Sequence, residues 1–241
     1  MSPEGDTPDG AANGDGDVLA ETIEKVEKLA PPQDRRRQLI ADDGPTDWFK
    51  ESARRWIMAM MADEGVHEPI ESGVRRTKAE IRSREKGTLA GLYVADILLR
   101  EWMPGARFTW TLSEGSRIDA ETCILTIEAS RHQILVCERI ILNILGRLSG
   151  IATKTAQWVA ISHIPLAATR KTCWGALDKA AVAVGGGLTH RIHRADALML
   201  KENDLASTAE DGDVGPTRVR KVLRDIPLDS IGAFVTVEVR S

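Results

Sequence analysis

The last third of the chain alternates short apolar runs with helix-like stretches, and this alternation constrains the fold more than any other feature. The apolar runs cover residues 164–169, 197–200 and 233–239, and amphipathic stretches at 175–184 and 217–226 separate them. Strands joined through a helix run in the same direction, so the pattern predicts a parallel sheet or barrel of βα units. Because three strands cannot close a barrel, we expect an incomplete barrel that is truncated at its C-terminal end.

Upstream, the pattern changes to strand, helix, strand, strand, which is typical of an α+β sandwich. Period-two alternation predicts strands over 77–85, 107–112 and 122–129, and an apolar stretch at 87–102 predicts a helix. A long helix is expected from residue 133 to about residue 160. The buried stripe of this helix is expected to contain Ile141, Ile144, Leu145, Leu148, Ile151 and Thr155.

We therefore predict an α/β protein with three segments. Residues 1–16 are rich in Gly, Asp, Pro and Ala, a composition that predicts a disordered acidic tail. Residues 17–140 are predicted to form an N-terminal α/β sandwich domain with a helical extension, whose helices cover 18–30 and about 46–61. Residues 141–241 are predicted to form the partial α/β-barrel domain.

Charge and composition exclude several classes of protein. Residues 1–24 hold seven acids and no Lys or Arg, which leaves 32 bases against 29 acids in the rest of the chain. This mild basic excess suits a small anionic ligand but is too weak to argue for nucleic acid. No apolar run approaches the roughly 18 residues of a membrane span, and the start lacks the pattern of a secretory signal. Three widely spaced cysteines predict no disulfide framework, so a cytoplasmic location is expected.

Charged residues follow the predicted strands at the positions where parallel α/β folds bind ligands. Arg170 and Lys171 follow the first strand, Lys201 follows the second, and Glu238 stands near the end of the third. The carboxyl ends of parallel strands meet at one edge of a sheet, so these side chains are expected to share a pocket. Guanidinium and ammonium groups gathered in this way predict a site for a polyanion.

A glycine run followed by a cationic turn lies between the first two predicted strands. Gly185, Gly186 and Gly187 precede His190 and Arg191 in the sequence GGGLTHR. Glycines let backbone N–H groups approach a phosphate closely, so this run is expected to act as a phosphate loop. Each piece also has an ordinary interpretation, because three glycines commonly end a helix and a lone histidine is commonly a turn residue. The joint placement at successive strand ends favours a binding site.

Several motifs, taken in chain order, carry a resemblance to a known family. They read ERIILNILGRLSGIAT at 138–153, TRKT at 169–172, DKA at 178–180, GGGLTHR at 185–191, DALMLKEN at 196–203 and VEV at 237–239. This ordered set resembles the quinolinate phosphoribosyltransferases (nicotinate-nucleotide pyrophosphorylases, carboxylating). GTLAGL at 87–92 resembles a motif of the family's N-terminal domain, so the resemblance covers about residues 77–241.

The resemblance implies an enzyme of NAD biosynthesis. It would transfer phosphoribose from phosphoribosyl pyrophosphate (PRPP) to quinolinate with decarboxylation, using magnesium, and would give nicotinate mononucleotide, pyrophosphate and carbon dioxide. The implied catalytic residues are Lys171, Lys201 and Glu238, with Glu238 on the ribose hydroxyls and magnesium. The implied substrate-binding residues are Arg139, Arg170, Lys171, His190, Arg191 and Lys201.

The family also implies a homodimer or larger homo-oligomer, in which Arg139 reaches the site of a neighbouring subunit. Family members continue for several more strands, which again implies a shortened barrel here. Trp174 and Leu177 replace a proline and an arginine of the family motif, and Asp204 replaces a histidine. These departures leave two alternatives: a related pyrophosphorylase-like transferase acting on another base, and a truncated, non-catalytic paralogue that binds anions.

Overall fold

The computed structural model describes residues 31–207, 215–226 and 232–238. The predicted acidic tail and the predicted helix over 18–30 lie outside the described residues. Residues from Gln33 onward belong to one compact unit, which holds all the elements described below.

The described part of the chain begins with small elements that lead into a helix. A short 3-10 helix, η1, covers Arg36–Gln38, and the strands β1 and β2 cover Ile40–Ala41 and Gly44–Pro45. Helix α2 covers Asp47–Asp63, and the Thr46 hydroxyl caps it by accepting a hydrogen bond from the Phe49 N–H at 3.2 Å. The predicted start of this helix is confirmed, and its end lies two residues beyond the expected one.

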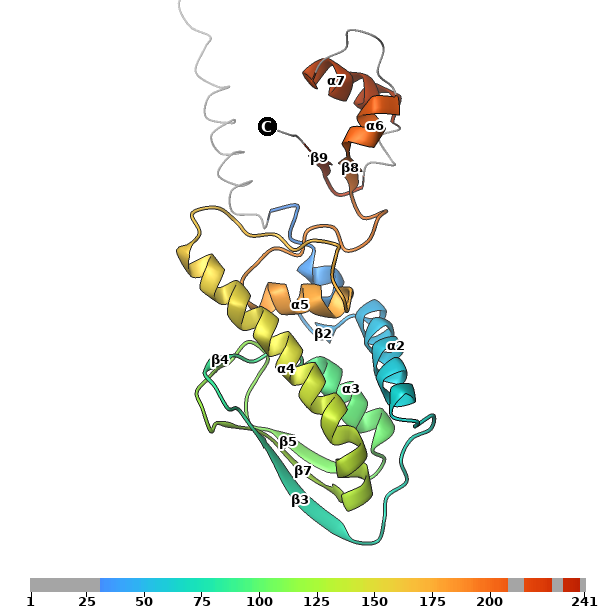
Figure 1. Cartoon of the computed structure of the whole chain (residues 1–241), viewed down its shortest axis with the longest axis vertical. Helices are drawn as coiled ribbons and strands as arrows, with labels where there is room; N and C mark the ends of the chain where they lie inside the picture. Colours follow the sequence, from blue (N-terminus) through green and yellow to red (C-terminus); the bar gives the residue numbers. More distant parts are fainter. Residues whose placement is uncertain (1–30, 208–214, 227–231, 239–241) are drawn as a thin grey trace, which may run out of the picture. The chain divides into compact units, whose positions relative to one another are not determined.

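The predicted order of strand, helix, strand, strand is confirmed. An antiparallel sheet with the order β3–β7–β5 forms from residues far apart in the chain. The bounds are β3 Arg76–Arg82, β4 Gly87–Thr88, α3 Leu92–Trp102, β5 Arg107–Trp110, β6 Arg117–Ile118 and β7 Cys123–Ser130. Leu125, Ile127 and Ala129 are buried on one face of the sheet, whereas Thr126 and Glu128 between them are partly exposed. Helices α3 and α4 pack against this sheet (Figure 1), where the Trp110 indole N–H donates to Asp96 of α3 at 3.2 Å.

Helix α4 covers Arg131–Ile161 and runs without a break through the predicted domain boundary at residues 140–141. Its first turn is fixed by a capping box, in which Ser130 and Gln133 exchange hydrogen bonds between side chain and backbone. The amide of Gln133 is fully buried and also donates to the Ile70 carbonyl at 2.8 Å. Four members of the predicted stripe are buried: Ile141, Ile144, Leu145 and Leu148. Cys137 and Ile140, which precede them on the helix, are buried as well.

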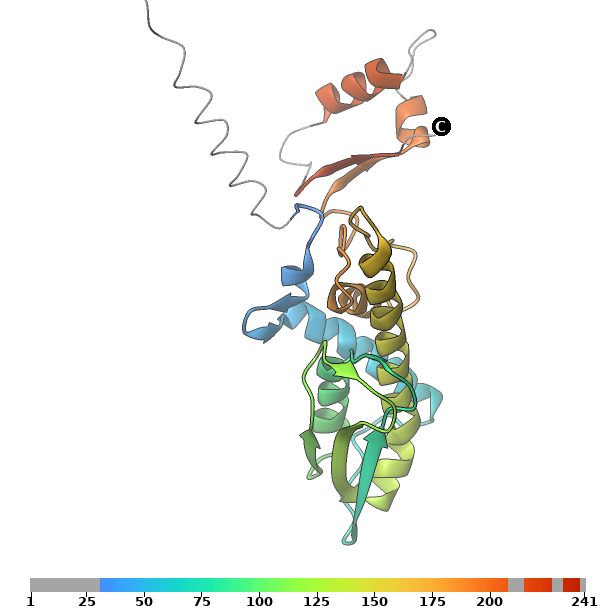
Figure 2. The same cartoon turned by 90° about the vertical axis from the view of Figure 1, so that its left-hand side faces the viewer.

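The C-terminal elements follow the predicted alternation in part. The bounds are α5 Ala176–Val184, β8 Leu198–Leu200, α6 Glu202–Ser207, α7 Gly215–Asp225 and β9 Val235–Val237. Strands β8 and β9 pair in parallel, with Leu198 opposite Val235, and Figure 2 shows them side by side. The short helix α6 was not expected, because a single turn gives no readable periodicity.

The run at 164–169 is not a strand, so the prediction of three parallel strands is wrong for the first of the three. Only an isolated parallel bridge forms, between Ala167 and Leu188. The Leu188 N–H donates to Leu166 and its carbonyl accepts from Ala168, so the run pairs with the loop after α5. Ile164 is 72% exposed, which shows that the start of the run buries little apolar surface. A mixed α/β fold is confirmed, and the barrel remains a prediction.

Two further observations concern the class of protein. No helix among the described residues is both long enough and apolar enough to cross a membrane. Cys123, Cys137 and Cys173 are all free in the structure.

Candidate anion-binding site

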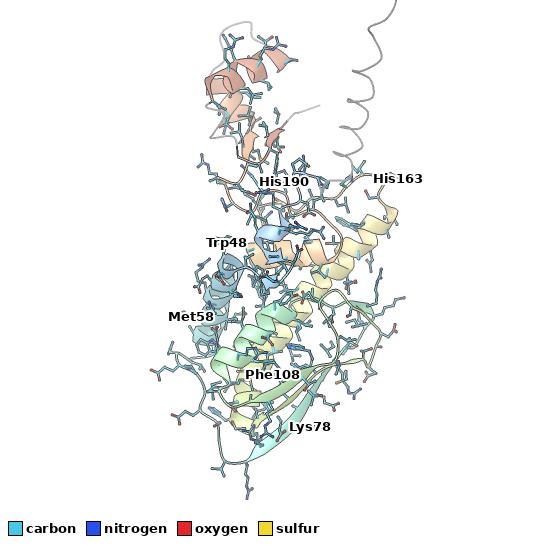
Figure 3. All side chains as sticks on the ribbon, turned by 180° about the vertical axis from the view of Figure 1, so that it is seen from behind. Trp48, Met58, Lys78, Phe108, His163 and His190 are labelled. Atoms are coloured by element: carbon cyan, nitrogen blue, oxygen red, sulfur yellow. The ribbon has the colours of Figure 1, made fainter. Side chains whose placement is uncertain are left out.

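A single pocket of about 390 Å³ brings together six of the residues predicted from the strand ends. These residues are Arg170, Lys171, His190, Arg191, Lys201 and Glu238. Figure 3 shows His190 beside the strands β8 and β9, between those strands and α5. The prediction that the cations meet around one hollow is therefore confirmed, although only two of the three expected strands form.

The parallel pairing of β8 with β9 positions one wall of the pocket. The Glu238 N–H donates to the Leu200 carbonyl at 2.9 Å, which sets the ends of the two strands side by side. Directly after them, the Lys201 ammonium lies 3.1 Å from the Glu238 carboxylate. Both side chains are about half exposed, so this ion pair contributes little to stability and can open to admit a ligand.

His190 lies in a left-handed turn between α5 and β8. Its φ of 51° is unusual for a residue other than glycine and costs about 1–2 kcal/mol. The ring packs edge-on against Phe234 with centroids 5.1 Å apart, and Nε2 lies 3.4 Å from the Thr236 hydroxyl. Burial lowers the pKa of His190, and the nearby cations Lys179 and Arg191 lower it further. A neutral imidazole can donate one hydrogen bond to an anion and accept another.

Arg191 is a buried guanidinium with part of its hydrogen-bonding capacity unused. Its Nη1 donates to the Ala197 carbonyl at 3.2 Å and its Nη2 lies 3.3 Å from the Met199 sulfur. The Nε has no hydrogen-bond partner in the structure. Burial lowers the pKa of Arg191, and Arg170 and Arg194 lower it further. An unpaired donor among mutually repelling cations favours an anionic ligand.

Lys179 is a second buried cation, and it belongs to the DKA motif at 178–180. Its side chain lies on α5 behind the pocket, 2% exposed, and the ammonium donates to the Thr189 carbonyl at 2.6 Å. Burial lowers the pKa of Lys179 to about 8, with further lowering by Arg170 and Arg191. The clue in the sequence is that Lys179 stands among alanines and valines on a short helix with little polar surface.

The three glycines end helix α5, which corrects the prediction of a phosphate loop. Gly186 has a φ of 89°, and the N–H groups of Gly185, Gly186 and Gly187 donate to Ala181, Ala183 and Val182 respectively. This is the Schellman pattern of a helix C-terminus. All three donors are therefore engaged, and none of the glycines lines the pocket. The ordinary interpretation of the run was the right one.

Two other residues lie away from the pocket. Arg139, near the start of α4, is 72% exposed and pairs with Glu64 of the same chain at 3.0 Å. The Trp174 ring lies 5.0 Å from the Arg147 guanidinium and 6.1 Å from the Trp56 ring of α2. Trp174 therefore packs within the protein and does not line the pocket.

Metal binding is supported only in part by the side chains. Among the described residues, no group of three or more His, Cys, Asp and Glu side chains could hold a metal ion. Glu238 brings one carboxylate to the pocket lining. Magnesium is commonly held by one or two carboxylates together with substrate phosphates, so Glu238 fits a magnesium ion that arrives with a phosphorylated substrate.

Comparison with known proteins gives the same family for both halves of the matched region. Residues 68–149 match the family described as quinolinate phosphoribosyl transferase, N-terminal domain. Residues 151–241 match the C-terminal domain of the same family. The junction between the two matches falls inside α4, as does the predicted boundary.

Individual curated relatives carry names of the same family. Quinolinate phosphoribosyltransferase (decarboxylating) 1 of Nicotiana glauca is 32% identical over 137 residues, covering 56% of this chain and 39% of that protein. Nicotinate-nucleotide pyrophosphorylase (carboxylating) of Mycobacterium leprae is 37% identical over 131 residues, covering 52% and 46%. The chain thus spans less than half the length of these two curated relatives.

Two solved structures extend the match over more of the chain. The crystal structure of NadC from Streptococcus pyogenes superimposes with a TM-score of 0.65 at 29% identity, covering 79% of this chain and 70% of that one. The nicotinate-nucleotide pyrophosphorylase of Francisella tularensis gives a TM-score of 0.65 at 28% identity, covering 80% and 69%. Since both domain families match in order over most of its length, this chain belongs to the quinolinate phosphoribosyltransferase family.

Proposed function

We propose that the protein transfers phosphoribose from PRPP to quinolinate and releases pyrophosphate and carbon dioxide, with nicotinate mononucleotide as the product. The observation that carries this proposal is the pocket, in which four cationic side chains from three segments of the chain, Arg170, Lys171, Arg191 and Lys201, line one hollow with His190. Quinolinate has two adjacent carboxylates and PRPP is a polyphosphate, so both substrates match the charge of the pocket.

The residue roles follow from the chemistry of each group. Arg170 and Arg191 would grip the two carboxylates through their planar forks, while His190 donates a hydrogen bond between them. Lys171 is exposed at the rim, where it would meet the phosphates as a compact charge. Lys201 would also hold phosphate, and this would free Glu238 for the ribose hydroxyls.

The transfer step makes one bond and breaks one. The lone pair of the pyridine nitrogen forms a bond to the ribose C1, and the bond from C1 to pyrophosphate breaks with its electrons on the leaving oxygen. Fixed cations stabilise the departing anion more than the bound substrate, which lowers the barrier. Magnesium, when bound by Glu238 and the phosphates, would supply further charge to the leaving group.

Decarboxylation would follow on the positively charged ring. The bond from the ring C2 to its carboxylate breaks, the electron pair is stabilised beside the cationic nitrogen, and C2 then takes a proton from water. The ring nitrogen is the electron sink, so this step needs no further cofactor.

The architecture and assembly of the whole protein are also proposals. Residues 141–241 would form part of an α/β barrel in which β8 and β9 are neighbouring strands. Arg139 is exposed on α4, and we propose that it completes the pocket of a second copy in a homodimer or larger homo-oligomer.

A product assay tests the proposed reaction. The chain is incubated with quinolinate, PRPP and magnesium, and nicotinate mononucleotide is followed by chromatography. Lys171→Ala should lower kcat/KM about 10²-fold or more, because a cation facing developing charge is lost, while the thermal midpoint stays unchanged. Lys78→Ala on β3 is the matched control, since this exposed lysine lies on another element and should leave turnover unchanged.

The outcomes separate the proposal from its alternatives. Product from quinolinate supports the transferase, whereas product from another base alone contradicts the substrate assignment. Binding of quinolinate without any product would favour the anion-binding paralogue. The family departures at Trp174 and Leu177 give no support to another base, because neither residue lines the pocket and Leu177 is fully buried.

A further inference from the structure

The segment of residues 34–38 holds the turn that carries His190 and Arg191 through hydrogen bonds and an ion pair. The Arg35 backbone N–H donates to the Thr189 hydroxyl at 2.6 Å. The Arg35 side chain spans to Asp196 on the other side of the turn, with Nη2 at 3.0 Å and Nε at 3.1 Å from Oδ1. One residue thus touches the turn on both its N-terminal and its C-terminal side.

Asp196 is the hub of these contacts. Its carboxylate is almost fully buried and accepts hydrogen bonds from the Gln38 amide at 2.8 Å and from the Ile192 N–H at 2.9 Å. Burial raises the pKa of Asp196, but the hydrogen bonds from Ile192, Arg35 and Gln38 outweigh it and the pKa is lowered. A buried carboxylate is tolerated only when it is paired, so loss of Arg35 would leave Asp196 without its charged partner.

The turn needs such support because its backbone is strained. His190 holds a positive φ, a conformation that persists only where the surroundings determine it. Thr189, immediately before it, is fully buried, and both of its side-chain and carbonyl oxygens are engaged, by Arg35 and Lys179 respectively. The strained turn is therefore held by α5 through Lys179 and by residues 34–38 through Arg35.

We infer that Arg35 is a positioning residue for the anion pocket, which fixes the turn through Asp196 and Thr189 so that His190 and Arg191 face the ligand. Arg35 lies outside the stretches that match the two family models, which begin at residue 68. The inference rests on the proposed function for the identity of the ligand, quinolinate, and on the contacts above for everything else.

The test compares Arg35→Met with Arg37→Met. Arg37 lies in the same segment but is exposed, 3.6 Å from the exposed Asp42, so its loss should leave the pocket unchanged. By calorimetry, Arg35→Met should weaken quinolinate binding about tenfold or more, because binding falls steeply when the side chains that contact the ligand are displaced. Arg35→Lys, which keeps a charge beside Asp196, should recover part of the loss. Gln38→Leu removes a single hydrogen bond to Asp196 and should give a smaller loss in the same direction.

A second readout needs no ligand. The His190 ring proton, assigned by its absence in His190→Gln, should shift in the NMR spectrum of Arg35→Met and not in that of Arg37→Met. A lower thermal midpoint with unchanged affinity and an unmoved His190 signal would make Arg35 merely structural and overturn the inference. If the unaltered chain fails to bind quinolinate, the proposed function fails and the His190 signal alone decides the role of Arg35.

Discussion

At the scale of single residues, the pocket depends on buried polar groups that hold the ligand-facing ones in place. Lys179 and Asp196 are both buried, carry opposite charges, and contact opposite sides of the same turn. Neither side chain lines the pocket, yet both influence the pKa of His190, a residue of the pocket lining. Changes behind the pocket should therefore alter the stability of the protein and the titration of the site.

Lys179 gives a pH dependence whose sign is fixed. Its pKa in the folded protein is about 8, below the ordinary 10.5, so between these values the unfolded chain binds a proton that the folded chain has released. Stability rises with pH wherever the unfolded state binds more protons. The free energy of unfolding of the unaltered chain should therefore rise relative to that of Lys179→Met from pH 8 to 10.5.

The comparison is made by urea unfolding at several pH values. Taking the difference between the two proteins cancels other groups, including Cys137, whose pKa burial raises to about 12 and whose effect on stability has the opposite sign. Lys78→Met, at an exposed lysine, is the control and should give no such trend. A difference that stays flat or falls across this window would contradict the buried position of Lys179.

At the scale of elements, the close approach of α5 to α4 sets the site in the fold. A Cβ at Gly185 would lie 2.5 Å from the Ala152 carbonyl and 2.6 Å from the Thr155 Cβ. A Cβ at Gly187 would lie 2.7 Å from a methyl group of Val182. The glycines are therefore required by packing and by the helix end, and they act on the pocket only by placing the turn that follows them.

Gly185→Ala should destabilise the protein by about 1–3 kcal/mol, because backbone and side-chain atoms of α4 must move to admit the new methyl group. Gly146→Ala on α4 is the matched control, since nothing lies within 4 Å of the added Cβ. In a helix interior this control should be neutral or stabilising by up to ~1 kcal/mol. Denaturant unfolding measures both, and equal effects would contradict the described packing.

The elements also show what periodicity can and cannot predict. Helix α2 was predicted because its apolar stripe follows a recognisable cap at Thr46. Helix α4 was predicted because its apolar stripe repeats over a long stretch of the chain. The run at 164–169 was predicted as a strand from its apolar character alone, and pairing depends on which partner the fold brings near. Residue type could not distinguish β8 from the loop at Leu188 as that partner.

At the scale of the whole molecule, the pocket joins segments that are distant in the chain. Arg170, Lys171 and Lys201 were predictable because they follow apolar runs, and Arg191 because it stands in the turn after the glycine run. The two strands that form are parallel and adjacent. The contact of Arg35 with Asp196 links residues 161 positions apart and has no local signal. Sequence therefore predicted the charged lining, while the residues that support it required the structure.

Calorimetric titration of the chain with quinolinate tests the central claim, that this lining receives a dicarboxylate. We predict that quinolinate binding weakens with added salt. Nicotinate, which has a single carboxylate, should bind about tenfold or more weakly than quinolinate, and Arg170→Ala should weaken quinolinate binding by a similar factor. No measurable binding, or equal affinity for both ligands with no effect of Arg170→Ala, would contradict the account.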